Sequence, residues 1–301
     1  MRSPLKPLLL AVIALSSSVV LAAKAPAIKV LILDGQNNHR WQETTPVLQE
    51  ILEEAGVFSV TVSTSPAKAA KGQPNDPKKW DGWNPNFAAY DVVLSNYNGE
   101  MWPEAVQKSF EDYVGNGGGF VVVHAANNSF GKWTEYNRMI GVGGWGGRNE
   151  KSGPWVHVVD GKVVRDESPG RGGSHGPRRE FPVVLIDQNH PTTKGLPKTW
   201  MHCKDELYCK LRGPAQNMDV QGYSFAKETN RNEPMLMTLT YGKGRVYHTP
   251  MGHDVEAMRC RGFYEIIQRG TEWAATGAVK HTAAVPKDFP TADKSSPVSG
   301  K

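Results

Sequence analysis

We predict an α/β fold in which a mostly parallel sheet carries helices on both faces. Short apolar runs typical of buried strands alternate with helical segments along the first half of the chain. Strands that alternate with helices of this length favour parallel pairing through right-handed crossovers. The balance of 39% hydrophobic and 22% charged residues in 301 also excludes disorder throughout and permits a full core.

The first strand is expected at 28–33, an apolar run typical of a strand buried on both faces, and a loop follows it up to Trp41. A helix comes next, which Thr44 or Thr45 caps and Gly56 ends. Further strands are expected at 57–62, 91–94, 120–123, 181–186, 206–211, 235–240 and 245–248, and further helices at 103–114 and 257–275.

Two segments depart from this alternation. Residues 141–176 hold 11 of the chain's 31 glycines, which predicts a long irregular insertion at about 141–180, forming a lid or wall beside a site. Residues 281–301 are polar and contain proline, so we expect a flexible tail. The folded domain is therefore expected to span residues 24–280.

Residues 1–23 have the features of a cleaved signal peptide: a short positive start, an apolar stretch and small residues at the end. The apolar stretch is too short to span a bilayer, so no membrane span is expected. We expect export, with a periplasmic location if the cell is Gram-negative. Without Arg2 and Lys6 of this segment the formal charge falls from +5 to +3, which together with the scattered basic residues gives no indication of nucleic-acid binding.

The three cysteines permit at most one internal disulfide. If the chain from Cys203 to Cys209 is extended, those two thiols are too far apart to pair. Either Cys260 takes part in a bridge or all three thiols are free.

The carboxyl ends of the strands indicate where a ligand binds, because open α/β sheets hold ligands there. His124 ends the 120–123 strand, and His253 with Asp254 follows the last strand. With Glu206, these residues are the candidates for acid/base chemistry. His124 or Glu206 would move a proton, and His253 with Asp254 would polarise a carbonyl oxygen.

Other residues near these strand ends are candidates for substrate or metal binding. Several tryptophans lie among glycine, proline or asparagine, and flat aromatic faces suit sugars. A divalent metal such as zinc is possible from the histidines, although the chain has no compact metal-binding spacing such as H-x-H. The substrate-binding candidates are His39, Asn96, Asn98, Trp133 and His175, and the metal candidates are His39, His124 and His253.

Two familiar motifs are rejected on their context. Residues 172–176 match the G-x-S-x-G pattern of serine hydrolases, but no strand precedes them and Pro177 follows, so the required strand-to-helix turn is not expected. Residues 115–119 are glycine-rich but lack the Gly-Lys-Ser/Thr ending of a phosphate-binding loop. No nucleotide cofactor is therefore expected.

Several stretches together resemble the trehalose-utilisation, or ThuA-like, family over about residues 28–277. They are Gly117-Gly118-Gly119-Phe120 leading to His124-Ala125-Ala126, the run 190–197, Asp205-Glu206-Leu207-Tyr208, the run 241–246, Gly252-His253-Asp254 and the run 269–274. The resemblance implies a fold of the flavodoxin-like, class I glutamine amidotransferase-like type. It also implies a role in disaccharide or glycoside use, around keto-sugars made by a partner sugar oxidoreductase.

The chain departs from amidotransferases at one position that matters. Their nucleophilic cysteine follows the strand that ends here at His124, and no cysteine lies near it. Glutamine hydrolysis is therefore not expected. We consider three functions: acid/base chemistry on a disaccharide or keto-glycoside, with or without a metal; non-catalytic sugar binding on an amidotransferase-like fold; and metal-dependent hydrolysis.

Overall fold

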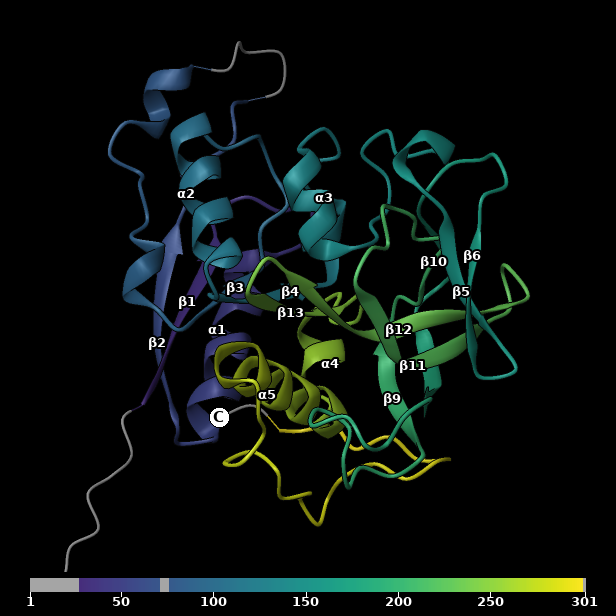
Figure 1. The fold of residues 1–301 in the computed structure, drawn as a ribbon. Helices are drawn as coiled ribbons and strands as arrows, with labels where there is room; N and C mark the ends of the chain where they lie inside the picture. The colour runs from purple at the N-terminus through teal and green to yellow at the C-terminus, as the bar shows by residue number, and fades with distance from the viewer. Residues whose placement is uncertain (1–26, 71–75, 300–301) are drawn as a thin grey trace, which may run out of the picture.

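The computed structural model describes residues 27–70 and 76–299, so the predicted signal peptide, residues 1–23, lies outside it. The described chain forms an α/β structure around one large sheet, in the order β2-β1-β3-β4-β13-β12-β11-β8-β9, with β5 and β6 attached beside β12. Figure 1 shows helices above and below this sheet. The predicted fold class is therefore confirmed.

The first half of the sheet is parallel. Its strands are β2 (Phe58–Thr64), β1 (Ile28–Asp34), β3 (Val92–Ser95), β4 (Gly119–Val123) and β13 (Gly244–Thr249). Both β1 and β3 are central in the sheet and contribute side chains to a core on each side of it, which explains why both strands are apolar on both faces. The predicted elements of this half agree with the structure to within a few residues.

Helices cover both faces of the parallel half (Figure 1). One face packs against α1 (Trp41–Glu54), α4 (Val255–Met258) and α5 (Arg261–Thr276), and the other against α2 (Glu104–Gly115) and α3 (Thr134–Ile140). The alternation along β1 divides its side chains between two cores, with Val30 and Ile32 in one and Leu31 and Leu33 in the other.

The second half of the sheet is antiparallel, so the prediction of a mostly parallel sheet is wrong for this part. Strands β12 (Arg231–Tyr241), β11 (Met218–Ala226), β8 (Arg179–Leu185) and β9 (Thr199–Asp205) pair in turn, and β12 also pairs antiparallel with β13. Sequence reasoning missed β9 and β11 because polar residues interrupt both. The strand expected at 206–211 is reduced to β10 (Tyr208–Cys209).

The glycine-rich segment contains a hairpin of β5 (Trp155–Val159) and β6 (Lys162–Asp166), followed by the short β7 (Ser174–His175). β7 pairs with β10, and this small sheet carries His175 next to Tyr208. A 3-10 helix precedes the hairpin at Glu150–Ser152, and others lie at Pro77–Trp80, Phe87–Ala89 and His124–Asn128.

Residues 281–299 lie against α5 and β9. The Met201 N–H donates to the Thr291 carbonyl at 2.7 Å, and the Arg261 N–H donates to the Ser296 carbonyl at 2.8 Å. The flexibility expected for this tail concerns its motion and stays a prediction. Among the described residues no helix has the length and apolar character that crossing a membrane would require.

The three cysteines are free and buried. The Cys203 N–H donates to the Cys260 sulfur at 3.2 Å, so these two residues are neighbours. Of the alternatives that the sequence leaves open, the structure has the free thiols.

Candidate functional site

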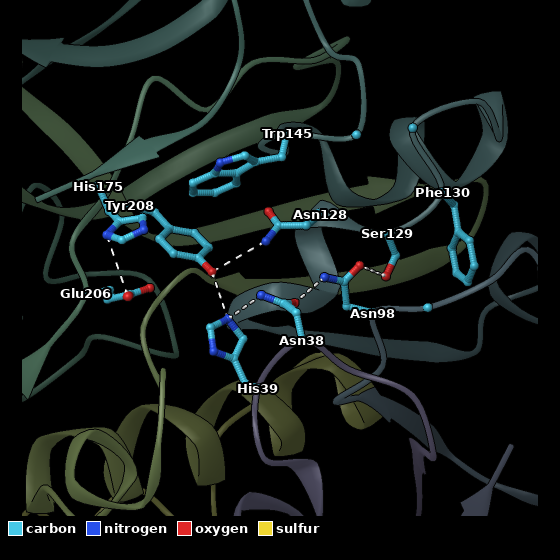
Figure 2. Close-up of a pocket in the computed structure, with 13 residues that line it drawn as sticks. Asn38, His39, Asn98, Asn128, Ser129, Phe130, Trp145, His175, Glu206 and Tyr208 are labelled. Carbon is cyan, nitrogen blue, oxygen red and sulfur yellow. Dashed lines mark hydrogen bonds and ion pairs between the residues drawn. The ribbon is translucent and has the colours of Figure 1, made fainter. Parts of the chain in front are cut away.

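A polar pocket of about 680 Å³ opens at the carboxyl ends of the parallel strands (Figure 2). The loops after β1, β3 and β4 supply one side of it, and the glycine-rich segment with β10 supplies the other. Its lining residues are Asn38, His39, Asn98, Gly99, Asn128, Ser129, Phe130, Gly131, Trp145, Gly146, His175, Glu206 and Tyr208.

His124 begins the 3-10 helix that follows β4 and is almost fully buried. Its Nδ1 lies 2.7 Å from the Pro250 carbonyl, which can only accept, so Nδ1 carries the proton. Its Nε2 is buried and has no hydrogen-bond partner in the described chain. Burial lowers the pKa of His124 to about 3, so the ring is neutral and Nε2 presents a free lone pair.

His39 comes from the loop after β1 and packs its ring against two other imidazoles. The centroid of its ring lies 4.8 Å from that of His124 and 4.6 Å from that of His253. Burial and the nearby His253 lower the pKa of His39 to about 4, so it too is neutral near pH 7. Its Nε2 lies 3.5 Å from the Tyr208 hydroxyl.

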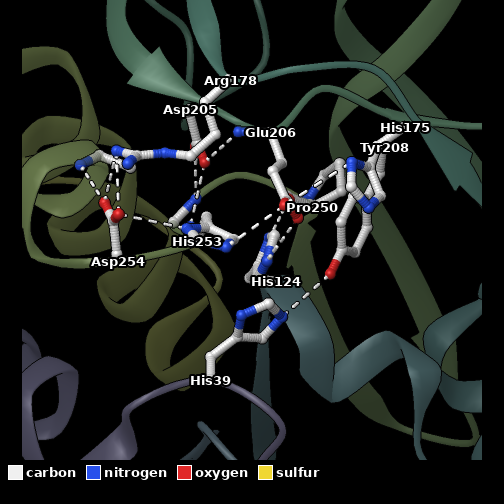
Figure 3. Close-up of polar contacts among 12 residues, drawn as sticks. His39, His124, His175, Arg178, Asp205, Glu206, Tyr208, Pro250, His253 and Asp254 are labelled. Carbon is white, nitrogen blue, oxygen red and sulfur yellow. Dashed lines mark hydrogen bonds and ion pairs between the residues drawn. The ribbon is translucent and has the colours of Figure 1, made fainter.

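Glu206 follows β9 and faces three histidines (Figure 3). Its carboxylate oxygens lie 3.3 Å from His253 Nε2, 3.6 Å from His175 Nδ1 and 3.9 Å from His124 Nε2. Burial raises the pKa of Glu206 against the opposing effect of the imidazoles. The carboxylate is therefore a partly buried group at the centre of the histidines.

His253 lies between two carboxylates, since its Nδ1 is 3.2 Å from Asp254 Oδ2. Burial lowers the pKa of this imidazole, but Asp254 and Glu206 outweigh that effect and raise it. Arg178 in turn approaches Asp254 to 2.9 Å. Of His39, His124 and His253, only His253 has a raised pKa, so it is the one of these three best suited to carry a proton.

Asp205 holds the loop that carries His253. Its fully buried carboxylate accepts from the backbone N–H groups of Gly252 at 2.7 Å and His253 at 3.0 Å, and it lies 2.9 Å from His202 Nε2. Burial would raise the pKa of Asp205, but His202 outweighs it and lowers the pKa to about 2. The adjacent Glu206 is positioned by the same turn of backbone.

His39, His124 and Glu206 form a group that fits a divalent metal. Each offers one ligand atom, and these atoms all lie within 4.8 Å of one another. Two neutral imidazoles and one carboxylate match the donor set of catalytic zinc sites, and the carbonyl partner of His124 Nδ1 matches their usual support. Of the predicted metal candidates, His39 and His124 belong to this group, whereas its third member is Glu206 and not His253.

Strained backbone gathers around the pocket. His124, Phe130 and Trp145 have φ values of 46°, 52° and 49°, in the left-handed region that non-glycine residues rarely adopt. Such conformations cost about 1–3 kcal/mol each and concentrate at functional sites.

The structure brings together most of the predicted site residues. His39, His124, His253, Asp254 and Glu206 meet at one place, with His175 beside Glu206 and Asn98 on the pocket wall. Asn96 and Trp133 lie elsewhere. The Asn96 amide donates to the hydroxyls of Thr44 and Thr45 at 3.0 Å, and Trp133 is buried in the core with its N–H on Glu111.

Asn38, Asn128 and Tyr208 also line the pocket, although none of them was named as a candidate from the sequence. Tyr208 follows Glu206 by two residues, and that spacing was the available signal. His248, in β13, is buried between the Ile140 carbonyl and the Asn127 side chain, so it does not reach the pocket.

The trehalose-utilisation family model, ThuA, matches residues 29–274. The chain belongs to the ThuA family. A ThuA-like protein from Parabacteroides merdae is 45% identical, covering 90% of this chain and 97% of its own, with a TM-score of 0.84. A second ThuA-like structure, from Bacteroides uniformis, is 18% identical, covers 86% of this chain and 95% of its own, and has a TM-score of 0.55, which shows the shared fold. No curated protein matches this ThuA-family chain.

Proposed function

We propose that this ThuA-family protein is an exported carbohydrate-active enzyme that performs metal-assisted acid/base chemistry on a disaccharide or keto-glycoside. The observation that carries the proposal is the free, buried Nε2 of His124, which faces Glu206 in a polar pocket. The family's description as trehalose utilisation supports a sugar as the ligand.

His39, His124 and Glu206 are the residues that would hold the metal. When bound there, a divalent cation such as zinc would act as a Lewis acid on a sugar oxygen. Because both imidazoles are already neutral, they are ready to bind a cation near pH 7 without first losing a proton.

His253 is the residue that we assign to proton transfer. It has a raised pKa, its side chain is 21% exposed, and Asp254 Oδ2 lies 3.2 Å from its Nδ1 on the far side. His124 is poorly suited to this step, because its proton is on Nδ1 and is held by the Pro250 carbonyl. We therefore assign His124 to holding the metal and His253 to moving the proton.

The rest of the pocket suits a sugar. Asn38, Asn98 and Asn128 offer amide donors and acceptors for hydroxyl groups, and Trp145 offers an aromatic face for the apolar side of a ring. The resemblance to the trehalose-utilisation family implies that the substrate would be a keto-glycoside produced by a partner sugar oxidoreductase.

The proposal is tested by titrating zinc into chelator-treated protein by calorimetry, and by following product formation from a panel of keto-disaccharides. Glu206→Gln should lose most zinc affinity and turnover, whereas Glu104→Gln, on the exposed first turn of α2, should change neither. Heat from sugar binding with no product from any sugar would contradict catalysis. Turnover that survives when zinc binding is lost would contradict the role of the metal.

Export is tested separately by cell fractionation of the full chain. We expect the mature protein in the periplasmic or secreted fraction, with its N-terminus after residue 23. Recovery in the cytoplasm with residues 1–23 retained would contradict export.

A further inference from the structure

A second cavity, of about 690 Å³, adjoins the pocket described above. The two share Trp145 and His175 as lining residues, so these side chains stand at the boundary between them. Figure 2 shows both side chains at the end of the first pocket that lies away from Phe130. The proposed function leaves this second cavity unused.

The lining of the second cavity includes two tryptophans and two glycines. Trp155 lines it, and its N–H donates to the Arg171 carbonyl at 3.2 Å. The guanidinium of Arg212 lies 4.5 Å from the centre of the Trp155 ring, and it is itself held by the carbonyls of Gly153 and Gly170 at 2.7 Å. The indole is therefore fixed before any ligand arrives, which lowers the entropy cost of binding.

Two cations line the same cavity, Arg171 and Lys210. The Lys210 ammonium lies 5.9 Å from the Trp155 ring, and within residues 27–70 and 76–299 neither cation has an ion-pair partner. Arg231, which also approaches Trp155, is by contrast neutralised by Asp166 at 2.9 Å. The cavity thus presents net positive charge beside an apolar surface.

Several backbone residues of this cavity have strained conformations. Trp145 and Lys210 have φ values of 49° and 54°, and Gly173 has a φ of 87°. A Cβ at Gly173 would lie 2.5 Å from the Trp145 backbone nitrogen, so only glycine permits the close approach of the two segments. Strained residues in two separate segments of chain indicate a surface shaped for a ligand.

We propose that the second cavity binds the second ring of the substrate, and that Arg171 and Lys210 select a ring with an acidic group such as a uronate. This inference rests on the proposed function, in which the first pocket takes the reacting sugar. A disaccharide that occupies both cavities would place its glycosidic bond beside His175, which lies 3.6 Å from Glu206.

The test measures the affinity of three probes by calorimetry: glucose, trehalose, and a disaccharide of glucuronic acid and glucose. We expect the acidic disaccharide to bind the natural protein about tenfold more tightly than trehalose, and trehalose more tightly than glucose. The preference for the acidic probe should fall as salt is raised, since screening weakens exposed charge pairs.

Lys210→Met keeps the unbranched shape and most of the length of the side chain and removes its charge. We expect it to weaken the acidic probe about three- to tenfold and to leave trehalose and glucose unchanged. Lys210→Arg should restore the preference, and Lys162→Met, on the exposed β6, should have no effect. Circular dichroism checks that each variant is folded.

Each result separates this inference from the proposed function. Equal affinity for trehalose and the acidic disaccharide, or equal weakening of all three probes in Lys210→Met, overturns the acidic second-ring site and leaves the first pocket standing. Affinity for glucose equal to that for trehalose overturns the second-ring site itself. Absence of binding by all three probes overturns this inference, whereas the proposed function fails only if the keto-disaccharide panel gives no product.

Discussion

The parallel and antiparallel halves of this molecule contribute to the site in different ways. The parallel half supplies His39 and His124 from loops directly after β1 and β4, and both rings are held in place by buried contacts. The other half supplies Glu206, Tyr208 and His175 from the ends of short strands and from the glycine-rich segment. A regular framework thus fixes the imidazoles, and an irregular wall completes the pocket around them.

The largest expected effect comes from the framework side. His124→Ala removes a proposed metal ligand whose Nε2 is directed at Glu206, so zinc affinity should be lost and turnover of a confirmed keto-glycoside should fall by at least the roughly 10- to 100-fold that losing even a supporting group of a metal site costs. Steady-state kinetics and calorimetry measure both quantities.

His190→Ala is the matched control, because His190 is a half-buried imidazole whose side-chain hydrogen bonds, among the residues that the structure describes, stay within its own turn, and because it packs on Trp273 outside the pocket. It should leave turnover and zinc affinity unchanged. Unchanged turnover in His124→Ala would show that the parallel half only frames the site.

The next prediction concerns Asp205, which links the two halves of the molecule. Asp205→Asn removes a buried charge that faces His202 and holds the amides of Gly252 and His253. Breaking a buried pair costs about 3–5 kcal/mol, so the free energy of unfolding should fall by about that amount in urea titrations. Cys209→Ser is the control, because Cys209 is buried but lies outside this network. It measures how much the free energy of unfolding falls when any buried side chain is changed.

The pH dependence has a definite sign. Because the pKa of Asp205 is lowered to about 2 in the folded state, its stabilisation is complete above its ordinary value of 3.8 and is lost as the pH falls from there towards 2. The Asn variant should lack this acid-dependent loss. An identical acid transition in the natural protein and in Asp205→Asn would show that Asp205 does not link the two halves.

The framework was largely predictable from sequence, because parallel strands buried on both faces leave continuous apolar runs such as Val30–Leu33. The rule that ligands bind at strand ends then located His39, His124 and His253. The antiparallel half was not predictable in the same way. β9 and β11 mix polar and apolar residues because one face of each is partly exposed, so no single period identifies them.

Two substrate-binding candidates show what the strand-end rule cannot resolve. Asn96 and Asn98 both follow β3. The Asn96 amide donates to the Thr44 hydroxyl, whereas Asn98 lines the pocket. Trp133 has polar neighbours in the sequence. It lies at the N-terminus of α3, however, and its side chain is buried in the core. The direction of a side chain in a loop depends on tertiary contacts that the local sequence does not encode.

A smaller effect is expected in the irregular wall. Gly173→Ala would force a Cβ to within 2.5 Å of the Trp145 backbone nitrogen at a φ of 87°. Relief of this clash should displace Trp145 and weaken sugar affinity about tenfold, with a loss of about 1–3 kcal/mol in stability. Gly161→Ala has a similar φ of 72° but no atom within 4 Å of the new Cβ, so it isolates the backbone penalty from the clash. Equal sugar affinity in the two variants would mean that Trp145 is not part of the binding wall.

The smallest effect tests the placement of Trp133 in the framework and not in the site. Trp133→Phe removes the hydrogen bond from the indole to Glu111, which is 2.7 Å long, while keeping most of the aromatic packing. The free energy of unfolding should fall by about 1 kcal/mol, the usual net value of a hydrogen bond, with a further contribution if the Glu111 carboxylate is left without a partner. Glu111→Gln and the double variant complete a cycle that measures the pair itself.

Sugar affinity, measured in parallel, should stay within twofold of the natural protein, because the Trp133 ring contacts α2 and α3 and does not line either cavity. A larger loss of sugar affinity in Trp133→Phe, with the free energy of unfolding unchanged, would show that Trp133 belongs to the binding surface and not to the framework.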